Sequence, residues 1–242
     1  MQKNPNRDSR FRDLKFRILN LSRISIFGFR AFPDFILDLL FPKKQAVREL
    51  EEADAAGFAS RAEKPNGFAG KDIISCFSYA DQKVRQAIWE LKYRGNKKIA
   101  RLLAEALYDE MLAFLEEYAP LTNFTDPLLI PIPLSKKRER ERGFNQCRLL
   151  TDVLTELDDG RNFTLSLTLK KVKDTASQTK VESREKRMEN LKGCFYADAN
   201  AVLRRNIILI DDVATTGATL MEAKRTLKAA GAKRVIAFTV AH

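Results

Sequence analysis

Beyond residue 72, short apolar runs alternate along the chain with amphipathic segments of helical period. The apolar runs predict strands over 73–79, 127–133, 163–169, 193–196, 206–210 and 234–240. The amphipathic segments predict a helix that ends at Gly95 and helices over 99–118 (stopped before Pro120), 144–157 and 219–230. Strands that alternate with helices are typical of βα units, so we expect an α/β fold with a mainly parallel sheet flanked by helices.

The first 70 residues follow a different pattern. Apolar residues at helical spacing lie among arginines and lysines over 11–21, which fits either a basic amphipathic helix that contacts a membrane or nucleic acid, or a frayed extension. Residues 35–41 and 43–56 predict two short helices, and a polar stretch with glycines and a proline from Gly57 to Gly70 predicts a linker. We therefore expect a basic, mostly helical N-terminal extension over 1–70 and a larger domain over 71–242.

The net charge of +11, from 43 Lys and Arg against 32 Asp and Glu, favours polyanionic partners. Phosphorylated metabolites, nucleic acid and an anionic membrane surface all satisfy this preference, and so does a basic surface that only keeps the protein soluble. The sequence lacks both an apolar stretch of the roughly 18 residues that a transmembrane segment needs and a secretory signal pattern. The three cysteines form no CxxC pair, so we expect a reducing, cytoplasmic location.

The segment 207–219 joins an apolar strand to two carboxylates and a hydroxyl-rich turn. Asp211 and Asp212 follow the strand directly, and ligands of parallel sheets lie beyond the carboxyl ends of the strands. The turn 215–219 leads into a helix, whose N-terminal N–H groups and dipole favour an anion. Gly217 permits a backbone turn that a Cβ atom would hinder. The segment therefore predicts a phosphate cradle beside a carboxylate pair.

The two halves of this segment suit different parts of one ligand. Carboxylates repel phosphate, but they accept hydrogen bonds from the neighbouring hydroxyls of a sugar. A sugar phosphate with free hydroxyls would therefore satisfy both halves. The simpler interpretation is a strand end with a capping threonine and two solvated acids.

The same segment resembles the motif with which type I phosphoribosyltransferases bind phosphoribosyl pyrophosphate (PRPP), an apolar strand followed by DD-x-x-TTG-x-T. The resemblance implies the type I phosphoribosyltransferase fold. It also implies that Asp211 and Asp212, the catalytic candidates, contact the ribose 2- and 3-hydroxyls and that the turn binds the 5-phosphate. The PRPP-binding candidates of the turn are Val213, Ala214, Thr215, Thr216, Gly217, Ala218 and Thr219.

Further segments are similar to the ComF family of competence proteins. Residues 131–146 look like the family signature PVPL-x-x-x-R-x-x-x-RGFNQ, and 174–193 resemble its Gln-containing loop. Residues 77–79 and 91–95 match its upstream elements. ComF proteins usually carry a four-cysteine zinc module after an LLDLLFP-type stretch, but here 37–42 are followed by no cysteine pair. We therefore expect no zinc.

The resemblance also assigns candidates for the pyrophosphate end of PRPP. The basic loop after Pro133 supplies Lys137, Arg138 and Arg142, although these charges also suit a solvated helix face. The polar segment 172–190 occupies the place of the family's flexible loop, or is an ordinary surface loop. Its candidates are Lys173, Gln178, Arg184 and Arg187. Residues 71–120 are the expected hood over the acceptor, for which no binding residue is identifiable.

The resemblance implies a phosphoribosyltransferase that moves the phosphoribosyl group of PRPP to a nitrogenous acceptor and releases pyrophosphate. Mg²⁺ would bind through the pyrophosphate, without direct protein ligands, and the implied setting is DNA uptake in natural competence. The alternative is a PRPP-fold protein without turnover that binds single-stranded DNA or proteins of the competence machinery. A homodimer is a further expected partner. A phospho-receiver domain does not fit, because its acidic pair comes near the start of the fold.

A few single residues receive simpler interpretations. His242, the only histidine, is expected in a flexible tail, and the three cysteines are expected to fill small spaces in the core. Trp89 is expected on the buried face of an amphipathic helix, and the alternative is that its ring stacks on a nucleic-acid base.

Overall fold

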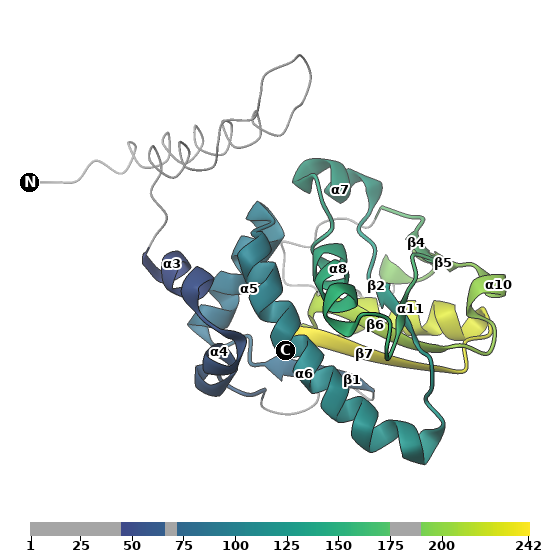
Figure 1. The fold of residues 1–242 in the computed structure, drawn as a ribbon. Coiled ribbons are helices and arrows are strands. Elements are labelled where there is room, and N and C mark those ends of the chain that lie inside the picture. The colour runs from purple at the N-terminus through teal and green to yellow at the C-terminus, as the bar shows by residue number, and fades with distance from the viewer. Residues whose placement is uncertain (1–44, 66–71, 175–189) are drawn as a thin grey trace, which may run out of the picture. The chain divides into compact units, whose positions relative to one another are not determined.

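The computed structural model describes residues 45–65, 72–174 and 190–242, and Figure 1 shows how their helices and strands are arranged. Residues Glu49–His242 form one compact unit, which holds the candidate site. The expectations for the amphipathic helix over 11–21 and for the 35–42 stretch lie outside the described residues. The domain boundary near residue 70 stays a prediction.

Two short helices precede the sheet, α3 (Gln45–Glu52) and α4 (Ala55–Arg61). The prediction that a linker begins at Gly57 is wrong, because α4 runs through this residue. Asp54 explains the difference, since its carboxylate accepts a hydrogen bond from the Gly57 N–H at 2.6 Å and caps the helix. Phe58 of α4 is buried edge-to-face on Phe77, with 5.3 Å between the ring centroids.

Five parallel strands form the central sheet in the order β1–β7–β6–β2–β3. They are β1 (Ile73–Phe77), β2 (Leu128–Pro131), β3 (Thr164–Leu165), β6 (Asn206–Val213) and β7 (Arg234–Ala241). Every residue of β6 except Val213 is buried, as expected for a central strand covered on both faces. The predicted α/β fold with a parallel sheet flanked by helices is confirmed.

Helices cover both faces of this sheet (Figure 1). The long ones are α5 (Gln82–Arg94), α6 (Lys97–Thr122), α8 (Gln146–Asp158) and α11 (Ala218–Ala229). α6 and α8 pack on each other and on the sheet, whereas α11 packs on β7 and on a separate hairpin. Gly95, with a φ of 58°, ends α5 as predicted, and Asn96 then caps α6. No helix within the described ranges is long and apolar enough to cross a membrane.

The helix predicted to stop before Pro120 runs on to Thr122, so this prediction is wrong. A proline in the last turn of a helix removes only one backbone hydrogen bond, which a long helix tolerates. The Thr122 hydroxyl donates to the Tyr118 carbonyl at 2.7 Å and satisfies an acceptor near the helix end. Asn123 then ends α6 in the left-handed conformation, with a φ of 52°.

The single strand predicted over 163–169 is also wrong, because two short strands in different sheets share this segment. β3 joins the central sheet, whereas β4 (Leu169–Lys171) pairs antiparallel with β5 (Phe195–Ala197). Phe163 and Leu169 are both buried, as the alternation implies, but Leu167 between them is 55% exposed. Alternation alone does not distinguish one strand from two short strands separated by an exposed residue. The short helix α10 (Ala199–Val202) was not predicted.

Candidate functional site

The acidic pair lies inside β6 rather than just beyond it. The strand continues to Val213, and the side chains of Asp211 and Asp212 are buried, with the two residues 8% and 4% exposed. Cys147 of α8 donates its thiol to Asp211 Oδ1 at 3.3 Å, and the Asp212 N–H donates to the same oxygen at 2.9 Å. The packing of α8 on the sheet therefore fixes the orientation of the Asp211 carboxylate.

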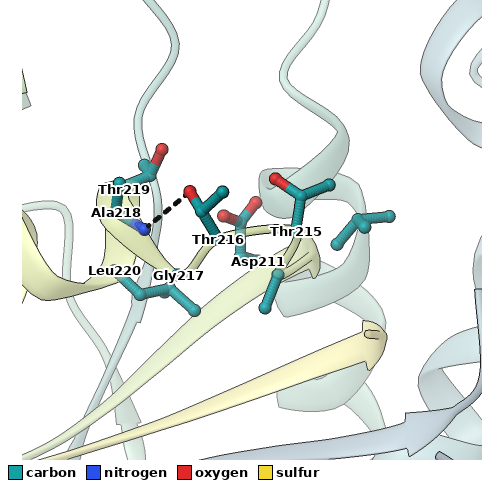
Figure 2. A pocket seen from close by; sticks show the side chains of 9 residues that line it. Asp211, Thr215, Thr216, Gly217, Ala218, Thr219 and Leu220 are labelled. Atoms are coloured by element: carbon teal, nitrogen blue, oxygen red, sulfur yellow. Dashed lines mark hydrogen bonds between the residues drawn. The ribbon is translucent and has the colours of Figure 1, made fainter. Parts of the chain in front are cut away.

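The turn after β6 and the start of α11 line one pocket together with Asp211 (Figure 2). The end of β6, the turn and the start of α11 together supply all seven predicted PRPP-binding residues, and Leu220 completes the lining. Gly217 has a φ of 70° and precedes α11 without a side-chain cap of its own, while the Thr216 hydroxyl accepts from the Ala218 N–H at 3.4 Å. The pocket thus places the N-terminus of a 12-residue helix beside a buried carboxylate.

Lys92 of α5 pairs with the second acid, since its Nζ lies 3.2 Å from Asp212 Oδ2. Burial by itself would lower the pKa of Lys92, but Asp212 and then Asp211 outweigh this effect and raise it. Sequence reasoning missed this role. The available signal is that Lys92 lies in the 91–95 segment, which resembles the ComF family, but the resemblance assigns that segment no function.

The environment of Asp211 weakens the acidity of its carboxyl group. Burial, and then the charge of Asp212, raise the pKa of Asp211 to about 7, while Lys92 opposes the rise. Burial and the same two acids also raise the pKa of the Cys147 thiol well above its ordinary value, so it stays a donor at neutral pH. Sequence reasoning expected Cys147 only to fill space in the core.

The basic segment after Pro133 forms a helix, α7 (Lys136–Arg142), and not the predicted loop. Ser135 caps its start and Gly143, with a φ of 78°, ends it. Lys137 is exposed and Arg138 half-buried. Arg142 is engaged elsewhere, because its guanidinium donates to Gln146 Oε1 at 2.9 Å and lies 5.3 Å from the centre of the Tyr93 ring. The pocket lining contains none of these three pyrophosphate candidates.

Lys171, the last residue of β4, is a cation near the site that the sequence did not single out. Burial lowers the pKa of Lys171, and the nearby Arg138 adds to this effect. Within the described residues, no carboxylate lies within ion-pair distance of Lys171. Of the flexible-loop candidates, Lys173 lies two residues after the end of β4. The other three, Gln178, Arg184 and Arg187, lie outside the described residues.

The RGFNQ segment joins α5 to the sheet. The Phe144 ring packs on Gly95, where a Cβ atom would lie only 3.0 Å from it. Asn145 donates from Nδ2 to the Ile132 carbonyl at 3.0 Å and caps α8 through the Cys147 N–H at 2.9 Å. This segment therefore positions the helices around the acidic pair.

Two single-residue expectations are wrong. His242 is held in place, because its Nδ1 lies 2.6 Å from the Ala214 carbonyl and its N–H donates to the Phe77 carbonyl at 3.1 Å. A terminal position alone gave no sign of this anchoring. Trp89 is 44% exposed rather than in the core. All three cysteines are buried, as expected.

The acidic pair is too small to hold a metal ion by itself. In the described part of the chain, no group of three or more His, Cys, Asp or Glu side chains is arranged to do so. A divalent cation here would therefore take most of its ligands from the oxygens of a bound substrate and from water.

Comparison with known proteins identifies the kind of domain that contains the pocket. The family model for the phosphoribosyl transferase domain matches residues 148–242, which include β6, the turn and α11. Competence protein ComFC of Bacillus subtilis is 34% identical over 169 residues, which cover 69% of this chain and 62% of that protein. Competence protein F of Haemophilus influenzae is 33% identical over 150 residues, covering 61% and 63%.

A third relative, DNA utilization protein YhgH of Salmonella typhi, is 33% identical over 150 residues that cover 61% of this chain and 62% of the relative. The chain thus spans less than two thirds of the length of each of these three relatives. The matching domain model, the acidic pair before the threonine-rich turn and the RGFNQ segment agree with one another. The chain belongs to the ComF family of competence proteins and contains a phosphoribosyltransferase domain.

Proposed function

We propose that the site binds PRPP and transfers its phosphoribosyl group to a nitrogenous acceptor. One observation carries the proposal: Asp211 and the start of α11 line the same pocket. A helix N-terminus stabilises a phosphate, and a carboxylate accepts hydrogen bonds from hydroxyls, so the pocket fits a sugar that carries both groups. The backbone N–H groups of 215–219 would bind the 5-phosphate, and the acidic pair would bind the ribose hydroxyls.

The reaction breaks the bond between ribose C1 and the pyrophosphate oxygen and forms a bond from C1 to the acceptor nitrogen. The electron pair of the broken bond leaves with pyrophosphate, and the acceptor nitrogen loses its proton. Positive charge grows on the ribose ring, where the buried Asp211 and Asp212 would stabilise it. Lys92 holds Asp212 in place for this task and offsets the repulsion between the two acids.

The leaving pyrophosphate needs cations, and two groups of residues could supply them. Arg138 lowers the pKa of Lys171, so two cations lie near each other beside the β4–β5 hairpin, which favours a bound anion. The second group that we propose for the pyrophosphate contains Lys137 and Lys173. It also contains the three flexible-loop candidates outside the described residues, Gln178, Arg184 and Arg187. When Mg²⁺ is bound through the pyrophosphate oxygens, it neutralises charge on the leaving group.

Calorimetric titration of Mg²⁺-PRPP tests the binding half of the proposal. We expect wild type to bind and the double variant Asp211→Asn/Asp212→Asn to bind at least tenfold more weakly, a loss of about 1.4 kcal/mol. Asp159→Asn is the matched control, because its side chain is 82% exposed and outside the pocket. Absence of binding to wild type would contradict the proposal.

Release of pyrophosphate in the presence of a panel of nitrogenous bases tests the transfer half. Binding of PRPP without release for any base would leave a PRPP-binding protein that is not a transferase. Arg138→Gln and Lys171→Gln should lower the release rate more than the PRPP affinity if they act on the leaving group.

A second candidate function is the handling of single-stranded DNA. It is favoured by the net charge of +11 and by relatives named competence and DNA utilization proteins. Binding through phosphate contacts weakens steeply as salt rises, because counterions are released. A fluorescent oligodeoxythymidylate should therefore bind with an affinity that falls by orders of magnitude between about 50 and 200 mM salt. Salt-independent or absent binding would refute this candidate.

A further inference from the structure

One side chain outside the pocket contacts the backbone of the proposed phosphate site. The imidazole Nδ1 of His242 lies 2.6 Å from the carbonyl oxygen of Ala214. Because a carbonyl oxygen only accepts hydrogen bonds, this contact requires the tautomer with a hydrogen on Nδ1. Ala214 directly precedes the turn 215–219 and lines the same pocket as Asp211. His242 therefore acts on the pocket through the backbone, without being part of the pocket lining.

The sheet holds His242 in a defined position. Its N–H donates to the Phe77 carbonyl at 3.1 Å, and its carbonyl accepts from the Tyr79 N–H at 2.8 Å. Phe77 is the last residue of β1, which pairs with β7, and β7 pairs in turn with β6, the strand that leads into the turn. Because the backbone of His242 is already ordered by these bonds, little entropy is lost when its half-buried side chain is held against Ala214.

The contact determines which way one peptide group faces. The peptide between Ala214 and Thr215 is trans, so its C=O and N–H point in opposite directions. Its carbonyl is directed to His242, and the Thr215 N–H therefore points the other way. The Ala214 N–H is bonded to the Ala241 carbonyl at 2.9 Å, but in the described ranges no acceptor pairs with the Thr215 N–H. Thr215 lines the pocket, so this N–H is a donor for a ligand (Figure 2).

Electrostatics give the orientation of this peptide group a function. A phosphate is stabilised by backbone N–H groups and repelled by carbonyl oxygens, which carry the negative end of the peptide dipole. If the peptide between Ala214 and Thr215 were reversed, its carbonyl would face the anion in place of the N–H. The hydrogen bond from His242 stabilises the favourable orientation before a ligand arrives, which lowers the cost of binding.

We propose that His242 is a positioning residue for the phosphate site, because it holds the Ala214 carbonyl away from the anion and leaves the Thr215 N–H to donate to it. The inference rests on the proposed function, in which this anion is the 5-phosphate of PRPP. It adds a residue that neither the sequence motif nor the pocket lining contains. The geometry predicts that the imidazole acts as a hydrogen-bond donor to the backbone, and that it does not touch the ligand.

Calorimetry with Mg²⁺-PRPP tests whether the donor on His242 is needed. His242→Phe keeps a ring and removes the donor, so it should weaken binding about tenfold. His242→Asn should keep near wild-type affinity, because its amide nitrogen is as many bonds from the backbone as Nδ1 and can donate to the same carbonyl. A purely structural role would not be rescued by an amide of smaller size.

Ser75→Ala is the matched control. It removes the hydrogen bond between the Ser75 and Thr239 hydroxyls at 2.8 Å, which also joins β1 to β7 but does not contact the turn. This variant should lower Tm and leave the PRPP affinity unchanged. Thermal unfolding followed by circular dichroism establishes that each variant is folded. Equal loss of affinity in Ser75→Ala and His242→Phe would overturn the inference, because any weakening of the strand ends would then have the same effect.

NMR with inorganic phosphate observes the Thr215 N–H directly. An amide proton that donates to an anion moves downfield, so saturation with phosphate should move the Thr215 signal downfield in wild type and in His242→Asn. The same signal should stay in place in His242→Phe. A Thr215 amide that fails to respond in wild type, or that responds equally in His242→Phe, would overturn the inference.

The two ligands separate this inference from the proposed function. If wild type and His242→Phe bind Mg²⁺-PRPP equally well, the role of His242 is refuted and the PRPP site stands. If phosphate moves the Thr215 amide in a manner that depends on His242 but PRPP does not bind, the role of His242 is supported and the transferase is refuted.

Discussion

The substitution Asp211→Asn is expected to stabilise the protein above pH 7 while it weakens the binding of the sugar. Burial, and then the charge of Asp212, raise the pKa of Asp211 from its ordinary value of 3.8 to about 7. The folded chain therefore holds a proton at Asp211 over a pH range in which the unfolded chain has lost it. The free energy of unfolding must then fall as the pH rises from about 4 to about 7, and it stays low above that range.

The difference between the two pKa values sets the size of the effect. It corresponds to at most about 4 kcal/mol, and we expect a gain of about 2–4 kcal/mol for Asp211→Asn at pH 8. Asparagine keeps the oxygen that accepts from Cys147 and from the Asp212 N–H, and it removes only the charge. For a chain of this size the gain raises Tm by about 5–10 °C.

Thermal unfolding followed by circular dichroism between pH 4 and pH 8 measures the effect. The difference in Tm between Asp211→Asn and wild type should be close to zero at pH 4 and largest at pH 8. The exposed control Asp159→Asn should show no such pH-dependent difference. A gap that shrinks as the pH rises, or equal Tm values at pH 8, would refute the assignment of a raised pKa to Asp211.

Three further substitutions probe the same site. Lys92→Met removes the cation beside Asp212 and should weaken PRPP binding at least tenfold in calorimetry. An unchanged affinity would mean that the ion pair between Lys92 and Asp212 does not contribute to PRPP binding. Gly217→Ala forces a side chain into a φ of 70°, so unfolding experiments should show a loss of about 1–2 kcal/mol, and wild-type stability would contradict this. Cys147→Ala removes a hydrogen-bond donor to Asp211 and should raise the pKa of Asp211, whereas Cys147→Ser keeps a donor and should leave that pKa near its wild-type value. An NMR titration of the Asp211 carboxyl measures both. An unchanged pKa in Cys147→Ala would count against the hydrogen bond.

The features of the fold that could be predicted are those determined by residues close together in the sequence. The apolar run of β6 is long enough to identify a buried strand, and Gly217 with its flanking threonines identifies the start of α11. Both depend on local backbone chemistry, so the pattern was sufficient. The parallel sheet followed in turn from the alternation of strands and helices, which leaves few other topologies.

The features that could not be predicted depend on residues distant in the sequence. Lys92 is ordinary on its own helix and becomes part of the site only because α5 lies beside the end of β6. α7 lacks any buried residue, so no apolar period distinguished it from a loop. Its helix is instead specified by the Ser135 cap and by Gly143 in the left-handed conformation.

The contacts between α5 and the RGFNQ segment explain why these two distant parts of the sequence matter to one site. Lys92 can meet Asp212 only if the C-terminal end of α5 has a fixed position, and Phe144 on Gly95 and Arg142 on Tyr93 both act at that end. Asn145 ties the same segment to the Ile132 carbonyl, directly after β2, the neighbour of β6. Asp212 thus has its cationic partner because α5 and the sheet are both held by the short turn between α7 and α8. A loosening of that turn should therefore disturb the charge balance of the acidic pair before it unfolds the sheet.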